Sequence, residues 1–301
     1  MTDIKTCFTN FIRRTLTRIS PRLNTAVIYR MKFKRTWDEN NPITFNDKIL
    51  WLKFHTYLNN ELVKQCADKY AVRDYIKKIG YGKLLIDLYG VYDDIEDIPW
   101  DNLPKQCVLK LNTGCGCNII VTDKDKLDIN YAKKKLYNGM KEKYYLTYSE
   151  MHYKHIKPRI IIEKYIGSDD GCLPVDYKFY CMNGKANTVM VCEDRDGINR
   201  PKFFFLDREW NKLPYTEEVF KYPNKVIEKP QKIDEAFDVA ESLAQDFPFV
   251  RVDLYIVKDK IYFGELTFTP SAGMDKDFEF KAPGQTKNID TILGELLKLP
   301  M

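Results

Sequence analysis

The segment Arg251–Gly273 contains the residues whose types and spacing suggest chemistry most directly. Arg251 and Asp253 stand two apart in an apolar run, so both side chains point to one face of a strand. Glu265 and Thr267 repeat this spacing on the next run. Two carboxylates from adjacent strands suit a magnesium ion that bridges phosphates, and an arginine beside them neutralises a phosphoryl group or an oxyanion. The alternative is a cross-strand ion pair between Arg251 and Glu265 on a solvated sheet.

The loop Thr269–Gly273 follows this pair of runs at once. Its backbone N–H groups would lie beside the predicted metal, as in a nest that binds an anion or an acyl group. We therefore assign Ser271 and Gly273 to the substrate. Taken alone, the loop is equally compatible with a simple turn.

A second candidate site centres on Lys110, near the end of an apolar run. It precedes a loop that contains Gly114 and Gly116. The lysine by its charge and the loop by its backbone amides can hold phosphates. The pattern is neither a P-loop nor a dinucleotide fingerprint, because no helix start follows it.

A third candidate is the apolar run Arg159–Ile166, which carries Glu163, Lys164 and Tyr165 near its exit. Backbone groups at such an exit can read the edge of an adenine base. A buried strand with a polar end is the alternative.

Hydrophobic periodicity predicts the elements that position these residues, and two short turns, Asn183-Gly184 and Lys258-Asp259, join hairpins. Antiparallel hairpins that alternate with helices indicate an α+β fold of more than one lobe, rather than a doubly wound parallel sheet. The predicted helices are Ile4–Ile19, Thr44–Tyr57, Asn60–Lys78, Ile129–Met140, Lys232–Gln245 and Thr291–Leu297. The predicted strands are Leu84–Tyr92, Cys107–Leu111, Ile119–Val121, Arg159–Ile166, Val175–Met182, Lys185–Cys192, Lys202–Leu206, Phe249–Val257 and Lys260–Phe268.

Six phrases occur in one order between residues 45 and 273: FNDKILWLK, DKYAVRDYI, VLKLNTGCGCNIIV, DYKFYCMNGK, FPFVRVDLY and IYFGELTFTPSAG. Together they resemble the TupA-like ATP-grasp family, named for a teichuronopeptide biosynthesis protein. The resemblance implies an ATP-grasp fold, in which two α+β lobes hold ATP between antiparallel sheets. It divides the chain into a basic arm (1–43), a helical region (44–106), a lid subdomain (107–168) and a catalytic subdomain (169–301).

The resemblance also implies a role for each matching residue. Lys69 and Lys110 would hold ATP phosphates under a lid loop that contains Gly114 and Gly116. The hinge that reads adenine would run from Glu163 through Lys164 and Tyr165 to Ile166, and Asp176 would contact the ribose. Asp253 and Glu265 would bind Mg²⁺, while Arg251 would steady the acyl phosphate. Lys178, Arg195 and Lys202 lie in the stretch expected to face the γ-phosphate and substrate, and we rank Arg195 first.

One position departs from the pattern. Many ATP-grasp ligases carry Asn two residues after the metal-binding Glu, whereas this chain carries Thr267. A hydroxyl is a weaker neutral ligand than an amide oxygen, so the second metal site is incomplete or is completed by water.

The expected activity is an ATP-dependent carboxylate–amine ligase that works through an acyl phosphate. The family context adds bacterial surface polysaccharide, with a uronic-acid carboxylate and an amino-acid amine as partners. A glycosyltransferase is one rival, but neither Asp93-Asp94 nor Asp169-Asp170 stands after an apolar strand as its metal site requires. A non-catalytic ATP-binding module is the other, and it would lack Asp253 or Glu265.

The basic residues gather at the N-terminus. Residues 1–36 carry nine Lys or Arg and one Asp, a net charge of +8, although the whole chain carries +5. Ile4, Phe8, Phe11, Ile12, Leu16 and Ile19 recur there at helical spacing. A basic amphipathic helix of this kind can contact an anionic membrane or a polyanion, or it can dock on its own domain with its arginines in water. We expect a cytoplasmic protein without a nucleic-acid partner, and peripheral contact of residues 1–36 with the inner membrane face or a polyanion stays open beside docking on the protein itself.

The cysteines and histidines give weaker signals. The eight cysteines are scattered without a metal-ligand spacing, so free thiols in a reducing compartment are expected. His152 and His155 have a helical spacing of three but lack a third ligand, which favours surface or pocket histidines over a metal pair. No apolar run of membrane-spanning length occurs.

Overall fold

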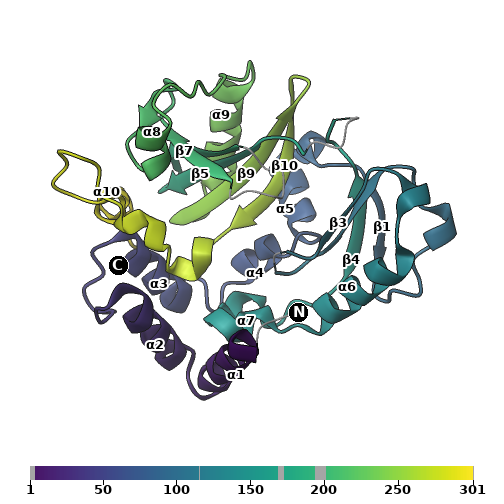
Figure 1. Cartoon of the computed structure of the whole chain (residues 1–301), viewed down its shortest axis with the longest axis horizontal. Coiled ribbons are helices and arrows are strands. Elements are labelled where there is room, and N and C mark those ends of the chain that lie inside the picture. The colour runs from purple at the N-terminus through teal and green to yellow at the C-terminus, as the bar shows by residue number, and fades with distance from the viewer. Residues whose placement is uncertain (1–3, 115, 169–172, 194–200, 301) are drawn as a thin grey trace.

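A computed structural model describes residues 4–114, 116–168, 173–193 and 201–300, and Figure 1 shows its helices and strands. The helices are α1 (Ile4–Ile19), α2 (Pro21–Phe33), α3 (Phe45–His55), α4 (Glu61–Ala67), α5 (Val72–Lys78), α6 (Ile129–Lys141), α7 (Tyr144–Tyr148), α8 (Glu217–Lys221), α9 (Ile233–Ala244) and α10 (Ile289–Leu296). The strands are β1 (Leu88–Tyr92), β2 (Cys107–Leu111), β3 (Asn118–Val121), β4 (Ile160–Lys164), β5 (Asp176–Met182), β6 (Lys185–Glu193), β7 (Lys202–Leu206), β8 (Lys212–Leu213), β9 (Phe249–Val257) and β10 (Lys260–Thr267).

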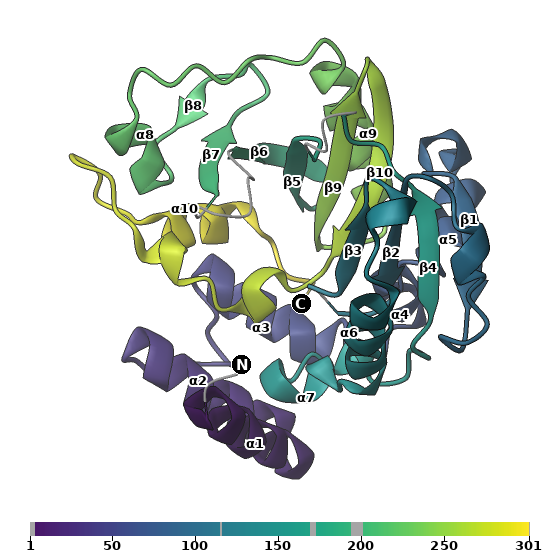
Figure 2. The ribbon, with the colours of Figure 1, turned by 45° about the vertical axis from the view of Figure 1, so that its right-hand side comes forward.

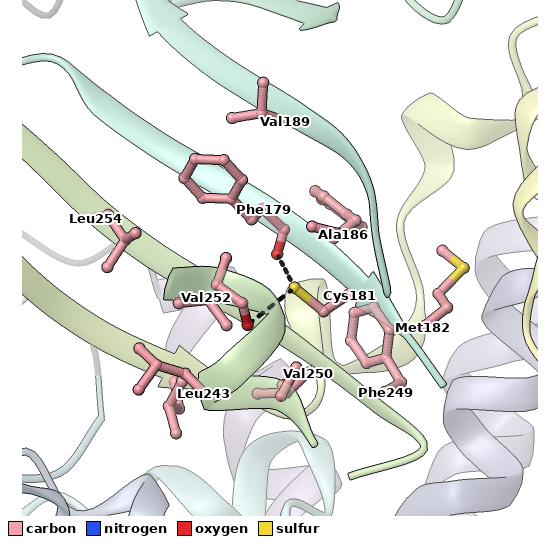
Figure 3. Close-up of a cluster of buried hydrophobic side chains, with 14 of the residues drawn as sticks. Phe179, Cys181, Met182, Ala186, Val189, Leu243, Phe249, Val250, Val252 and Leu254 are labelled. Carbon is pink, nitrogen blue, oxygen red and sulfur yellow. Dashed lines mark hydrogen bonds between the residues drawn. The ribbon is translucent and has the colours of Figure 1, made fainter. Parts of the chain in front are cut away.

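The larger sheet has the order β10-β9-β5-β6-β7-β8, and every pair of neighbours is antiparallel. Along β9, Val250, Val252 and Leu254 are buried on the face that packs against α9, and Figure 3 shows them around Cys181 of β5. Because side chains alternate along a strand, Arg251 and Asp253 face the other way. The core on one face of the sheet therefore fixes the polar set on the other.

The smaller sheet has the order β1-β4-β2-β3 and encloses a core of its own against α6. Gly139 of α6 lies so close to this sheet that an added Cβ would stand 2.6 Å from the Leu111 side chain and 2.8 Å from the Cys117 sulfur. The two sheets and their separate cores form two lobes, which Figure 2 shows side by side. The arrangement confirms the α+β expectation.

The hairpin of β9 and β10 contains a bulge that the strand prediction did not include. From the turn, residues pair in regular register as far as Phe263 with Leu254, and then Glu265 pairs with Asp253. Gly264 is the extra residue, and a Cβ there would stand 2.8 Å from the Asp253 carbonyl oxygen. Without the bulge, Glu265 would fall opposite Val252 and point to the core face. Gly264 therefore brings Glu265 to the face of Asp253.

Several predicted elements need correction. The single helix predicted over Asn60–Lys78 is wrong, because the chain turns between α4 and α5. There the Asp68 carboxylate accepts hydrogen bonds from the backbone N–H groups of Tyr70 and Ala71, which ends the first helix. The strand predicted over Leu84–Tyr92 begins only at Leu88. The short elements α2, α7, α8 and β8 were not predicted.

The other predicted helices and strands are present with small shifts at their ends. Helix α3 begins as predicted: the Thr44 hydroxyl accepts from the Asp47 N–H, and the Asp47 carboxylate accepts from the Thr44 N–H. Both predicted hairpin turns occur, with positive φ at Asn183 (52°) and Gly184 (76°). The small sheet includes β1, which precedes residue 107, so this lobe begins within the region 44–106. The four subdomain boundaries otherwise stay predictions.

Candidate active site

Arg251 is the centre of a buried charged network on the large sheet. Its guanidinium donates two hydrogen bonds to Asp253, each 2.7 Å long, and a third to the Thr267 hydroxyl at 3.1 Å. Thr267 in turn donates to Glu265 at 3.1 Å. Lys178 of β5 donates to Asp253 at 2.6 Å. The predicted grouping of the arginine, the two carboxylates and the threonine hydroxyl on one sheet surface is confirmed, and Lys178 adds to it.

The charges of this network balance one another. Lys178 also pairs with Asp176 at 2.5 Å, and Lys69 reaches Glu265 at 3.6 Å from the turn between α4 and α5. Three cations thus face three carboxylates. Burial acts to raise the pKa of Glu265, but Lys69, Arg251 and Lys178 outweigh it and lower that pKa to about 2. Burial opposes the charge of Arg251, yet Asp253 raises the pKa of the guanidinium further above its usual value.

A second charged group lies on the small sheet. The Lys110 ammonium is 2.7 Å from the Glu163 carboxylate, which Arg73 of α5 approaches at 3.4 Å. The predicted phosphate lysine and the first residue of the predicted hinge are therefore brought together on adjacent strands. Lys69 donates to the Gly114 carbonyl oxygen at 2.8 Å, so it connects the glycine loop with the large sheet. Lys69 was expected on a helix, and it lies instead in the turn that Asp68 caps.

The loop after β10 is strained. Ser271, Ala272 and Gly273 all have positive φ, at 49°, 58° and 76°. For Ser271 and Ala272 this left-handed conformation costs about 1 kcal/mol each. The buried ammonium of Lys53 stabilises the loop by donating to the Ala272 carbonyl oxygen at 3.4 Å and to the Tyr148 carbonyl oxygen at 2.6 Å. Strain held by surrounding structure is a feature of ligand-binding loops.

Two cavities meet at Arg251 and Ser271. The larger, about 830 Å³, extends past Lys69, Gly114, Glu265 and Thr267 to the N-terminal helix α1. The smaller, about 600 Å³, lies over β5 and β7 beside Lys178. Cationic and tyrosine side chains also line the larger cavity, together with the carboxylates Glu142 and Glu150: Arg13, Arg14, Lys32, Tyr144, Tyr148 and Tyr153. Four carboxylates stand among the walls of the smaller one: Glu217, Glu218, Asp275 and Asp277.

The donor set fits a hard divalent cation. Asp253, Glu265 and Thr267 offer only oxygen atoms, the ligands that Mg²⁺ prefers. Glu265 is one-third exposed and faces the larger cavity, whereas Asp253 is buried and its two oxygens accept from Arg251 and Lys178. In the described part of the chain no group of three His, Cys, Asp or Glu residues is placed to hold a metal. Any cation here therefore relies on phosphate or water oxygens as well.

The remaining predicted residues are the rest of the hinge, Gly116, Lys202 and Arg195. Lys164 is exposed and lies 3.4 Å from Asp87, while the buried Tyr165 donates to the Ser168 carbonyl oxygen. Ile166 is half-buried next to them, and Gly116 has a φ of 82° in the loop after β2. Lys202 lies over the ring of Tyr222 at 4.3 Å. Arg195, like Cys115, Cys172 and the pair Asp169-Asp170, lies outside the described residues.

The expectation for the histidines is half wrong. His155 is exposed as predicted, but His152 is buried against Phe268 and Tyr153. Burial, with a smaller effect of Lys53, lowers the pKa of His152 to about 3, so it is a neutral core residue. Five described cysteines are free thiols, as expected: Cys7, Cys66, Cys107, Cys117 and Cys181.

Sequence reasoning missed several residues of the site. Glu150 lines the larger cavity and accepts from the Thr269 hydroxyl at 2.6 Å. The outer wall from α1 and α7, with Arg13 and Tyr148, was also missed. The one signal available was Gly264, an isolated glycine in a strand pattern, which is typical of a bulge.

Comparisons with known proteins place the chain in a family. The sequence model described as TupA-like ATPgrasp matches residues 47–298. A comparison with the curated proteins finds no sequence match. Among solved structures, D-alanine–D-alanine ligase from Bacillus anthracis is 18% identical, with 71% of this chain and 60% of that chain covered and a TM-score of 0.40.

Two further structures are similar at the same level. The ATP-grasp ligase PsnB, complexed with minimal precursor, Mg and ADP, is 13% identical over 98% of this chain and 73% of that chain, with a TM-score of 0.40. N5-carboxyaminoimidazole ribonucleotide synthetase from Thermotoga maritima is 12% identical over 80% of this chain and 51% of that chain, with a TM-score of 0.42. This chain thus spans about 60% and 51% of the lengths of the first and third of these proteins. With the family model matched over most of the sequence, the chain belongs to the TupA-like ATP-grasp family.

Proposed function

We propose that this protein joins a carboxylate to an amine at the expense of ATP, with Mg²⁺ bound beside the nucleotide. The observation that carries the proposal is the convergence of Arg251, Lys178 and Lys69 on Asp253 and Glu265, where a large cavity opens between the lobes. Such a set can neutralise transferred phosphate without a covalent enzyme intermediate. Family membership supports the same reaction class.

The chemistry has two balanced steps. An oxygen of the substrate carboxylate attacks the γ-phosphorus of ATP, and ADP leaves, which gives an acyl phosphate. The amine nitrogen then attacks the acyl carbon, orthophosphate leaves, and the nitrogen loses a proton as the amide forms. Arg251 and Lys178 would balance the negative charge that builds up, because both already neutralise carboxylates in a buried site. When bound, Mg²⁺ would supply charge neutralisation near Glu265, Asp253 and Thr267.

The nucleotide would bind between the lobes. Lys69 and Lys110 would hold its phosphates, with the glycine loop above them, and the backbone from Glu163 to Ile166 would read the adenine. Asp176 would contact the ribose. The ion pairs of Lys110 with Glu163 and of Lys69 with Glu265 support this assignment. Each lysine already binds an anionic oxygen, and a phosphate oxygen could take the place of the carboxylate.

The two cavities suggest which substrate binds where. Arg13 and Lys32 with three tyrosines suit an acidic saccharide in the larger cavity, where tyrosine rings can stack on a sugar and cations can bind its carboxylate. Arg14 in the same wall is already paired with Glu142. Carboxylates such as Asp275 and Asp277 suit an ammonium group in the smaller cavity. A uronic-acid polymer and an amino acid fit these preferences, which supports a role in bacterial surface polysaccharide.

The test is an assay for ADP and orthophosphate with purified protein, ATP and magnesium over a panel of uronates and amines. We expect ADP release that requires both partners and a product lighter than their sum by one water molecule. The proposal fails if no member of the panel releases ADP. Binding of ATP without turnover would support a nucleotide-binding module, and a preference for a UDP-sugar would favour a glycosyltransferase. The glycosyltransferase alternative would need Asp93 as a metal ligand, but this half-exposed carboxylate forms ion pairs with Lys157 and Arg159.

A further inference from the structure

Helix α1 has its polar and apolar faces reversed with respect to an ordinary surface helix. The large apolar side chains on its outer face are mostly exposed: Phe8 65%, Phe11 65%, Ile12 41% and Ile19 71%. On the opposite side, Thr9 and Arg13 line the larger cavity, and Thr17 is buried. A helix that only covers its own domain turns its apolar face inward. The exposed face of α1 therefore needs a partner outside the chain.

Hydrogen bonds fix this orientation. The Thr17 and Ser149 hydroxyls lie 2.9 Å apart, and the Asn24 amide of α2 donates to both, at 2.8 and 3.0 Å. Arg14 pairs with Glu142, and Arg13 donates to the Tyr148 hydroxyl at 3.2 Å. These polar groups on the inner face of α1 bond to residues of α7 and its two ends. Rotation of α1 about its axis would break all of these bonds. The helix cannot hide its phenylalanines without leaving its site.

Helix α2 continues the exposed apolar surface. Leu23, Val27 and Met31 are exposed along one side of it, and Leu23 follows Ile19 across the turn at Ser20. Figures 1 and 2 show α1 and α2 together at the lower end of the molecule. We call this surface the outer face of α1 and α2, and its apolar members are Phe8, Phe11, Ile12, Ile19, Leu23, Val27 and Met31.

Positive charge surrounds this outer face. Arg18 of α1, Arg30 of α2 and Lys34 directly after α2 are exposed there, whereas Arg22 donates to Glu39 at 2.9 Å. The stretch from Ile4 to Lys34 contains no Asp or Glu. Exposed aromatic and aliphatic side chains among arginines and lysines are typical of helices that lie in the interface of an anionic bilayer. No helix in the described ranges is long and apolar enough to cross a membrane.

We propose that the outer face of α1 and α2 docks on the surface of a bilayer that contains anionic lipids. A bilayer accounts for both components, since the acyl region accepts the phenylalanines and the headgroups accept the cations. A soluble polyanion would leave Phe8 and Phe11 in water. A second copy of the chain would bring two basic faces together without an acid to separate their charges. The bilayer surface is the occupant that matches both the apolar and the charged residues.

The larger cavity lies on the other side of α1, with Arg13 in its wall. Docking would therefore hold this cavity near the lipid headgroups, within reach of a substrate that is itself attached to lipid. This last consequence rests on the proposed function, whereas bilayer binding does not. The two ideas can fail separately, because vesicle binding is measured without nucleotide.

The experiment is co-sedimentation of the full chain with vesicles of phosphatidylcholine, alone or mixed equally with phosphatidylglycerol. We expect binding only to the mixture. The variant Phe8→Ser/Phe11→Ser should bind at least about tenfold more weakly because two exposed rings no longer enter the interface. The variant Arg18→Gln/Arg30→Gln/Lys34→Gln should bind about 100-fold more weakly, since each cation near an anionic surface contributes about 1 kcal/mol.

Matched controls change equal numbers of exposed residues on other elements. Tyr131→Ser/Val226→Ser removes two exposed apolar side chains, and Lys258→Gln/Lys281→Gln/Lys298→Gln removes three charges. Both should bind vesicles as the unchanged chain does. Unchanged thermal melting of every variant shows that the fold is kept.

Five outcomes would overturn the proposal. The unchanged chain could fail to bind the anionic vesicles, or it could bind both kinds equally. The controls could lose as much binding as the outer-face variants. A soluble polyuronate could bind the unchanged chain and the Phe8→Ser/Phe11→Ser variant equally well, which would assign the face to a polyanion. Sedimentation velocity without lipid could reveal a dimer of the unchanged chain that the Phe8→Ser/Phe11→Ser variant does not form. If the unchanged chain also failed to bind vesicles, the outer face would be assigned to a second copy of the chain.

Discussion

At the residue scale, Thr267 joins the cation and the carboxylate that face the larger cavity. Its hydroxyl accepts a hydrogen bond from Arg251 and donates one to Glu265, and each bond is 3.1 Å long. Both partners are charged, so the hydroxyl is worth more than in a neutral pair, about 1.5–3 kcal/mol. Its contribution is to fix the position of two charged groups against each other, whether or not it also binds a metal.

The first prediction is that Thr267→Val lowers kcat/KM for ATP-dependent turnover about tenfold or more, because Arg251 and Glu265 lose a shared partner. Valine keeps the shape but loses both hydrogen bonds, so the melting temperature should fall as well, and turnover is compared at a temperature at which every variant is folded. The matched control is Thr188→Val, which removes a buried hydroxyl bonded to the Leu206 carbonyl oxygen at 2.8 Å in the same sheet. Equal activity losses in the two variants would contradict the role of Thr267.

His152 gives a second prediction at this scale, on pH. Burial, with Lys53, lowers its pKa from 6.5 to about 3. Between these values the unfolded chain binds a proton that the folded chain does not, so stability falls as pH falls from about 6.5, by at most about 1.4 kcal/mol per pH unit. His152→Phe should flatten this dependence in urea unfolding, whereas His155→Phe, at an exposed site, should leave it unchanged. A slope that persists in His152→Phe would show that other groups cause it.

How far residues can be assigned from sequence depends on what sets their environment. The alternation of Arg251 and Asp253 in an apolar run was sufficient to place both on the face away from the core. The burial of His152 was not predictable, because it depends on Phe268, which is far away in the chain. For the same reason, the ion pair of Lys110 with Glu163 required the order of the strands, which local pattern does not give.

At the element scale, the loop after β2 brings Gly114 to the wall of the larger cavity. Gly114 and Gly116 both have positive φ, at 70° and 82°. A Cβ at Gly114 would stand 2.6 Å from the Tyr144 ring, whereas one at Gly116 meets nothing within 4 Å. The two positions thus share backbone strain and differ in their contact with the cavity wall.

The third prediction uses this difference. Gly114→Ala should lower turnover much more than Gly116→Ala, because it displaces Tyr144 and the carbonyl oxygen that Lys69 binds at 2.8 Å. Both variants should lose about 1 kcal/mol of stability from backbone strain alone. Turnover and urea unfolding of the two proteins check this. Equal turnover in both variants would mean that the Tyr144 contact has no functional weight.

Elements whose pattern was self-contained were predicted well, and those set by a partner were not. Thr44 and Asp47 together fix the start of α3, and the turns Asn183-Gly184 and Lys258-Asp259 fix two hairpins. In contrast, the helical pattern continues through Asp68, so only the competing side-chain hydrogen bonds end the helix there. The apolar pattern of α1 predicted its helix but could not show that this face points outward.

At the scale of the whole molecule, the proposed nucleotide site draws on both lobes, each with its own core. The fourth prediction is that a non-hydrolysable ATP analogue with magnesium slows amide exchange in both lobes at once. Peptides that contain Leu109–Gly114, Ile162–Ile166 and Arg251–Thr267 should gain protection together, because ligand binding stabilises the closed arrangement. Helix α10, which lines neither cavity, serves as the control segment.

Hydrogen exchange followed by mass spectrometry measures this directly. Protection confined to one lobe would contradict a site shared between the sheets. Magnesium alone should give little change, since the described residues contain no group of three His, Cys, Asp or Glu side chains placed to hold the ion.

The border that Arg251 and Ser271 form between two cavities also bears on the order of events in turnover. Under the proposed function, the acid and the amine approach one point from separate openings, so neither blocks the path of the other. Either substrate can then bind first, and the amine can already be waiting when the acyl phosphate forms. The acyl phosphate would then last only until the amine bound on the other side of Arg251 attacks it. No second substrate would have to diffuse in first.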